Sequence, residues 1–293
     1  MRAVRLLPLL LLAGCAREDF PILFPSGPVA ALERDLLLVA LALMMIVVVP
    51  VYLMTWLFVR RYRMRPSSRP DDPGYWPNWD YSWRIDAAVW GVPALIVAVM
   101  AGLVLYYTNR LDPYRAEGPE GADPLRVQVV AQDWKWLFLY PDHGIASLNE
   151  LAFPADRPLA LDMTSDTVMT SFAIPALGGQ IYVMAGMETE LHLVADGPGT
   201  FRGRNTQYSG EGFAHMHFEA RAMTDEAFEA WLRKARMAPA LDLAAYDALR
   251  APSVDAPPRR WGALAPDLFE TIIARYRAPL PEPPESLAEM EAN

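Results

Sequence analysis

Thiol and imidazole side chains, common ligands of copper and zinc, are scarce in this 293-residue chain. It has one cysteine, Cys15, and four histidines. A single thiol excludes an intramolecular disulfide and any site in this chain that needs two thiolates. His215 and His217 are alternate residues of an expected strand, so both could point to one face and chelate a metal. We interpret them instead as polar residues on the solvent-facing side of that strand.

Cys15 lies at the end of a signal-like segment. Residues 6–13 are apolar and follow Arg2 and Arg5, a pattern typical of secretory signal peptides. Small residues directly before a cysteine resemble the bacterial lipoprotein signal, in which cleavage makes the cysteine an acylated N-terminus. We therefore expect a signal peptide over residues 1–14 and lipidation at Cys15. A plain signal peptide with an incidental cysteine is the alternative.

Two further apolar blocks are long enough to span a bilayer, which takes about 20 residues. They predict transmembrane helices over 36–59 and 86–108. The loop between them, 60–85, is rich in arginine, and positively charged loops stay in the cytoplasm. The N-terminal segment 15–35 and everything after the second helix are therefore expected on the periplasmic side.

Asp86 is an ionisable residue at the cytoplasmic start of the second helix. Such groups at a membrane edge are candidates for a functional role. The alternative is a carboxylate that the positive end of the helix macrodipole favours.

The rest of the chain reads as a soluble domain. Strand-like segments separated by Pro, Gly and Asn/Asp clusters predict a β-sandwich over 111–223. Residues 224–278 predict short helices, with Thr224 as an N-cap, and 279–293 a flexible tail rich in Pro and Glu. The net charge of −9 argues against a nucleic-acid partner.

Several stretches, spread over residues 20–278, carry a family resemblance: VVPVYLMTW (48–56), RIDAAVWGVP (84–93), QDWKW (132–136), NELAFPADRP (149–158), SFAIPALGGQIYVMAGMETELHL (171–193) and QYSGEGFAHMHF (207–218). They resemble subunit II of haem-copper respiratory oxidases, specifically of the cytochrome bo-type ubiquinol oxidases. The resemblance implies a membrane-anchored α+β chain: a two-helix transmembrane hairpin, a cupredoxin-like β-sandwich and a short C-terminal helical region.

Relatives that accept electrons from cytochrome c carry a dinuclear copper centre in this domain, with two cysteines in a Cys-x-x-x-Cys loop, two histidines and a methionine. The resemblance places Tyr208 and Gly212 at the cysteine positions, Thr170 at the first histidine and Met216 at the second. Copper in such sites needs soft thiolate donors. We therefore expect no metal and no bound cofactor in this chain, and we interpret Trp134 and Trp136, in the QDWKW stretch, as packed sandwich residues.

The resemblance implies a non-catalytic subunit of a proton-translocating ubiquinol oxidase in the bacterial inner membrane. Its partners would be subunit I, which holds the haems and copper and oxidises ubiquinol, together with subunits III and IV and membrane lipid. In this family a glutamate at the position of Asp86 lies near the mouth of a proton-uptake channel, so Asp86 is a candidate to help protons enter. The alternatives are a cytochrome c oxidase subunit II and a free-standing cupredoxin-like assembly lipoprotein.

Overall fold

A computed structural model describes residues 20–63, 80–115, 118 and 122–277. The chain divides into two compact units. One comprises residues 32–112, and the other comprises the segment up to Ala31 together with the chain from Pro113 onward. Cys15, the predicted signal peptide and the predicted tail lie outside the described residues.

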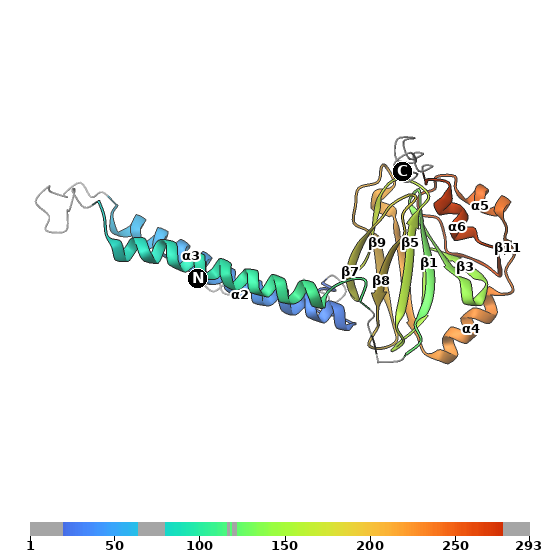
Figure 1. Cartoon of the computed structure of the whole chain (residues 1–293), viewed down its shortest axis with the longest axis horizontal. Coiled ribbons are helices and arrows are strands. Elements are labelled where there is room, and N and C mark those ends of the chain that lie inside the picture. The colour runs from blue at the N-terminus through green and yellow to red at the C-terminus, as the bar shows by residue number, and fades with distance from the viewer. Residues whose placement is uncertain (1–19, 64–79, 116–117, 119–121, 278–293) are drawn as a thin grey trace, which may run out of the picture. The chain divides into compact units, whose positions relative to one another are not determined.

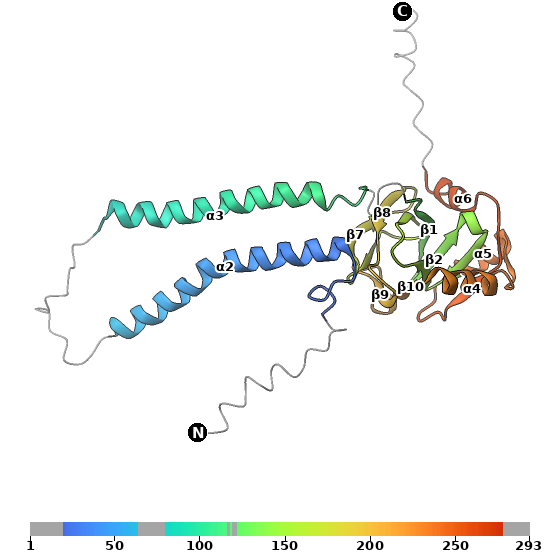
Figure 2. The same ribbon diagram turned by 90° about the horizontal axis from the view of Figure 1, so that it is seen from below.

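The first unit contains two long helices, α2 (Pro28–Arg61) and α3 (Trp83–Arg110), which run in opposite directions (Figures 1 and 2). Both are long and apolar enough to cross a membrane. Each has one internal proline, Pro50 or Pro93, which membrane helices tolerate. Both extend beyond the predicted 36–59 and 86–108, because the helical backbone continues through polar residues that flank the apolar blocks.

The second unit is a β-sandwich (Figure 1). Its six-stranded sheet has the order β12-β3-β2-β1-β5-β8, formed by Arg259–Trp261, Ile145–Leu148, Lys135–Tyr140, Leu125–Gln132, Leu159–Ser165 and Thr189–Leu193. Its five-stranded sheet has the order β4-β10-β9-β6-β7, formed by Glu150–Pro154, His217–Met223, Gly199–Asn205, Thr170–Ile174 and Gly178–Val183. A two-stranded sheet pairs β11 (Ala240–Leu241) with β13 (Ala263–Leu264).

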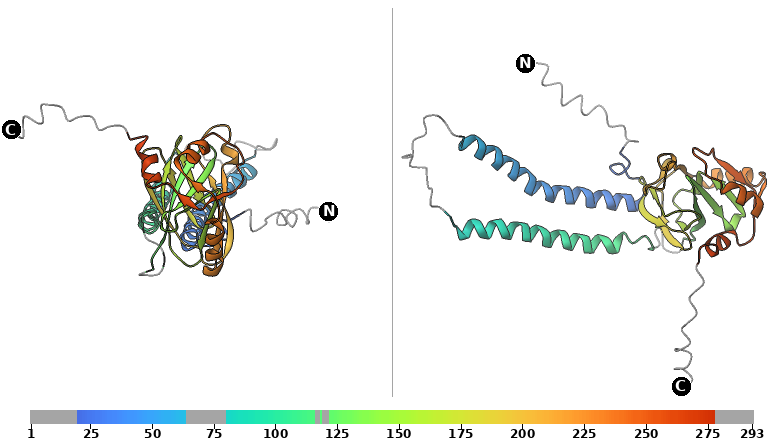
Figure 3. Two further views of the ribbon diagram at one scale, coloured as in Figure 1. Left: turned by 90° about the vertical axis from the view of Figure 1, so that its right-hand side faces the viewer. Right: turned by 90° about the horizontal axis from the view of Figure 1, so that it is seen from above.

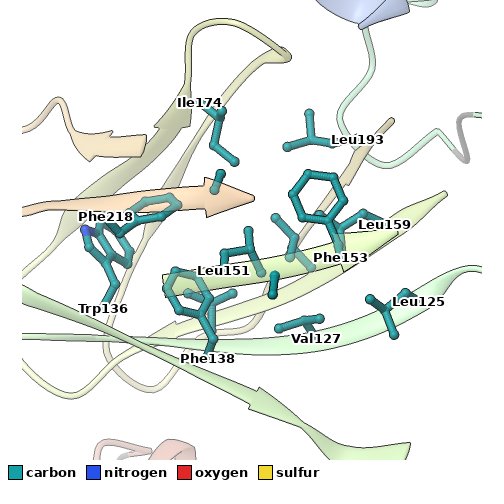
Figure 4. Packing of buried hydrophobic residues seen from close by; sticks show 14 of the residues in the cluster. Leu125, Val127, Trp136, Phe138, Leu151, Phe153, Leu159, Ile174, Leu193 and Phe218 are labelled. Carbon is teal, nitrogen blue, oxygen red and sulfur yellow. The ribbon is translucent and has the colours of Figure 1, made fainter. Parts of the chain in front are cut away.

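Aromatic and branched side chains from both sheets fill the space between them (Figure 4). Trp136, Phe172 and Phe218 form its aromatic centre, with ring centroids 5.1–5.8 Å apart. Trp136 is fully buried. Its prediction as a packed sandwich residue is therefore correct.

Three short helices follow the sandwich: α4 (Asp225–Ala235), α5 (Leu243–Leu249) and α6 (Leu268–Ala274). Thr224 caps α4, since its side chain accepts a hydrogen bond from the Ala227 amide. Helices α5 and α6 cover the outer face of the six-stranded sheet and form a second core there with Val130, Leu137 and Leu139 (Figures 1 and 3). The predicted fold class of helix pair, sandwich and C-terminal helices is confirmed.

The segment before α2 is attached to the sandwich. The Ser26 amide donates to the Ala176 carbonyl at 2.8 Å, and the Ser26 carbonyl accepts from the Asp196 amide at 2.9 Å. Gly178 has a φ of +88°, and a Cβ on it would lie 2.5 Å from the Ala30 nitrogen. Only glycine allows this close approach, so residues 28–31, which belong to the sandwich unit, pack directly against the β6–β7 connection.

Candidate functional site

The residues that the family resemblance assigns to copper positions lie at one end of the sandwich. Thr170 begins β6, and Met216 immediately precedes β10. Tyr208 and Gly212 belong to the 206–216 connection between β9 and β10. The backbone joins these parts, because the Thr206 amide donates to the Ser171 carbonyl and the Asn205 amide donates to the Met216 carbonyl.

An amide side chain, Asn205, organises this end. Its Oδ1 accepts from the amides of Ser171 at 3.0 Å and Gln207 at 2.9 Å. Its Nδ2 donates to Oγ of Ser209 at 3.0 Å and to Sδ of Met216 at 3.3 Å. Asn205 is only 5% exposed, so these bonds are made away from solvent. One neutral side chain therefore ties β6 to the 206–216 connection.

Trp134 fills the space beside Gly212. The indole Nε1 donates to the Ser209 carbonyl at 3.0 Å. A Cβ on Gly212 would lie 2.2 Å from Cδ2 of the ring. Trp134 reaches this place from the β1–β2 turn, where its φ is +63°. It is the half-buried member of the tryptophan pair and packs against the edge of the core.

The four positions do not supply the thiolate that copper sites of this type need. Gly212 has no side chain, and the Tyr208 side chain is exposed, packing on Phe213 with a centroid distance of 5.8 Å. Thr170 is buried, and its hydroxyl has no hydrogen-bond partner among the described residues. The Met216 thioether is engaged by Asn205. Copper in cupredoxin-type sites depends on a thiolate, which none of these residues supplies.

The two histidines do not share a strand face, so that prediction was wrong. His215 ends the short helix η4 (Phe213–His215), and β10 begins only at His217. The His215 Nδ1 lies 2.9 Å from Oδ2 of Asp255. The His217 Nδ1 is buried and has no hydrogen-bond partner in the described part of the chain. His215 therefore belongs to a helical turn and His217 to the strand that follows, which a strand pattern could not reveal.

Asp86 lies in the first turn of α3, after Ser82 as the N-cap residue. Its amide donates to the Ser82 carbonyl at 2.9 Å, and its side chain is exposed. This position agrees with both interpretations of the residue, the macrodipole partner and the proton-uptake group.

A buried carboxylate, Asp166, joins the sandwich to the C-terminal helices and has no counterpart in the sequence prediction. Its Oδ2 accepts from the Tyr246 hydroxyl at 2.6 Å and from Nε of Arg250 at 2.8 Å. Its backbone carbonyl accepts from the Tyr276 hydroxyl at 2.9 Å. Burial, followed by the bond to Asp166, raises the pKa of Tyr246. The only sequence signal for this contact is that tyrosine and arginine residues, Tyr246 and Arg250 among them, recur after position 240.

Comparison with known proteins places the chain in a family. Residues 236–279 match a family model described as the COX Aromatic Rich Motif, which includes Tyr246 and Tyr276. The chain is 44% identical to cytochrome bo(3) ubiquinol oxidase subunit 2 of Pseudomonas aeruginosa, over 94% of this chain and 81% of that protein. It is 42% identical to ubiquinol oxidase subunit 2 of Acetobacter aceti, over 91% of this chain and 85% of that protein.

The chain belongs to the ubiquinol oxidase subunit 2 family. This confirms the resemblance, and it favours the ubiquinol oxidase interpretation over both alternatives. Among solved structures, the chain is similar to the periplasmic domain of subunit II of cytochrome oxidase of Bradyrhizobium japonicum, at 26% identity and a TM-score of 0.38. That similarity covers 41% of this chain and 98% of the solved domain.

Proposed function

We propose that this chain is a copper-free, non-catalytic subunit II of a proton-translocating ubiquinol oxidase. In this proposal, subunit I holds the haems and copper and oxidises quinol. The overall reaction converts two quinols and one oxygen molecule into two quinones and two waters. Subunits III and IV complete the complex. This chain binds no cofactor, and it anchors and supports subunit I.

The observation that carries the proposal is the sandwich end built from Asn205 and Trp134. An amide and an indole occupy the interior next to the degenerate ligand positions, and their hydrogen bonds are already made within the chain. Inserting a metal there would require breaking these bonds without gaining a thiolate. Without a metal relay in this domain, electrons must reach subunit I by another route, and a quinol dissolved in the bilayer supplies one.

For localisation, we propose the inner membrane. Helices α2 and α3 span it, and the arginine-rich connection lies in the cytoplasm. Acylation at Cys15 adds a second anchor on the periplasmic side, where the sandwich also lies. Asp86 then lies at the cytoplasmic face, where it helps protons enter the complex.

The decisive experiment is oxygen consumption by the detergent-purified complex. Reduced cytochrome c and a reduced short-chain quinol are offered in separate runs. The proposal expects rapid turnover with quinol and none with cytochrome c. Turnover with cytochrome c would require an electron relay outside subunit I and would overturn the copper-free assignment. Metal analysis of the same sample should give copper equal to that bound by subunit I alone.

A further inference from the structure

A surface cavity of about 630 Å³ lies between α4 and the neighbouring ends of β9 and β10. Its walls combine three cationic side chains with small apolar ones. Arg221 comes from β10, Arg260 from β12 and Lys234 from α4. Its size falls in the range of small-molecule sites, about 300–1,000 Å³.

A buried carboxylate, Glu150, holds the two arginines in place. Its Oε1 accepts from Nη1 of Arg221 at 2.9 Å, and its Oε2 accepts from Nε of Arg260 at 2.8 Å. Arg260 Nη2 also bonds Oε1 at 2.9 Å. Glu150 is 3% exposed, whereas the arginine side chains are 41% and 30% exposed. Oε2 of Glu219 also lies 3.8 Å from Nε of Arg221, and no hydrogen bond among the described residues engages Nη2 of Arg221 or Nη1 of Arg260.

Trp231 forms part of the cavity wall. It is only 5% exposed, and the Arg260 guanidinium lies over its ring at 5.2 Å. The ring therefore helps to hold Arg260 in position beside the cavity. Lys234 is exposed, and none of the described carboxylates forms an ion pair with it.

We propose that this cavity binds a phosphate group through Arg221, Arg260 and Lys234. Guanidinium groups match phosphate oxygens in pairs, and several charges converging on one cavity suit a group with three or more oxygens. Small side chains, Ala222 and Ala227 among them, also line the cavity. A lipid headgroup and free inorganic phosphate share this chemistry.

The test measures binding to the intact purified complex by titration calorimetry. The two probes are inorganic phosphate and dihexanoyl phosphatidylglycerol below its micelle concentration. Two variants are compared with the wild type: Lys234→Gln and the matched control Arg233→Gln. Arg233 is exposed on the same helix but does not line the cavity, and its replacement by glutamine removes the same charge as Lys234→Gln. Lys234→Gln changes an exposed side chain, so it leaves the fold intact.

We expect Lys234→Gln to weaken binding about tenfold, the effect of losing one charge-assisted hydrogen bond, while Arg233→Gln binds like the wild type. An effect seen with inorganic phosphate assigns the free anion as ligand. An effect seen only with the lipid assigns the headgroup. If neither probe binds, or if Lys234→Gln and Arg233→Gln bind both probes equally, the proposal is overturned.

Discussion

Replacing Gly212 with alanine should destabilise the sandwich unit, because Trp134 occupies the space that a Cβ atom needs. The new atom would lie 2.2 Å from Cδ2 and 2.3 Å from Cγ of the ring. These atoms are near the base of the indole, so rotating the far end of the side chain does not relieve the clash. The Gly212 backbone itself, with φ −86° and ψ 4°, accepts alanine without strain.

The magnitude follows from three terms. Overpacking costs about 1–3 kcal/mol, and displacing the ring also loses its hydrogen bond to Ser209, about 0.5–1.5 kcal/mol. Alanine restricts the unfolded chain and returns about 0.4–1 kcal/mol. The net loss is about 2 kcal/mol, which lowers the thermal midpoint by roughly 4–8 °C for a unit of this size.

The assay is thermal unfolding of the full-length chain in detergent, followed by near-UV circular dichroism. Gly212→Ala is measured in the wild type and in a Trp134→Ala background. Alanine at position 134 keeps the same left-handed backbone, so the background removes the ring without changing that strain. We expect the cost of Gly212→Ala to disappear in this background. An equal drop in midpoint in both backgrounds would refute the packing argument.

Three further predictions concern other residues. Asn205→Ala should lower the free energy of unfolding by about 2–3 kcal/mol, because it leaves the buried Ser171 amide without its acceptor. Ser209→Ala should lower it by less than about 1 kcal/mol, and the thermal midpoints of the two variants test this difference. Burial raises the pKa of Tyr140, so the stability that its neutral hydroxyl contributes is complete below pH 10 and declines by about 1.4 kcal/mol per pH unit above it. The gap in stability between wild type and Tyr140→Phe should therefore narrow above pH 10 in denaturant titrations. Asp86→Asn should lower quinol-driven oxygen consumption across the active pH range, and Asp80→Asn should not; unchanged turnover in Asp86→Asn would end the proton-uptake proposal.

The helices and the sandwich could be predicted from sequence because their signals are local. Charge-free blocks longer than 20 residues and the Thr224 cap each depend on neighbouring residues alone. The failure at His215 has the same origin, since a single helical turn before a strand leaves no periodic signal. The sequence likewise does not reveal that the Tyr208 side chain is exposed to solvent.

The contacts that shape the sites connect distant parts of the chain, and no local pattern records them. Glu150 meets Arg260, and Asp166 meets Tyr246, across 110 and 80 positions. A buried carboxylate and an exposed one look alike in a sequence. The role of Asn205 was hidden for the same reason, because its partners come from two strands and a connection that only the sandwich brings together.

In the proposed function, the end of the sandwich around Asn205 holds no copper. A metal in a loop does two things: it carries electrons, and it fixes the loop to neighbouring strands through its ligand bonds. Here neutral groups fix the loop to the neighbouring strands. Asn205 bonds both β6 and the 206–216 connection, and Trp134 packs against Gly212. The loop therefore keeps a defined shape without a charged centre. Such a domain can still support a partner subunit, while electron delivery depends on a substrate that reaches the partner through the bilayer.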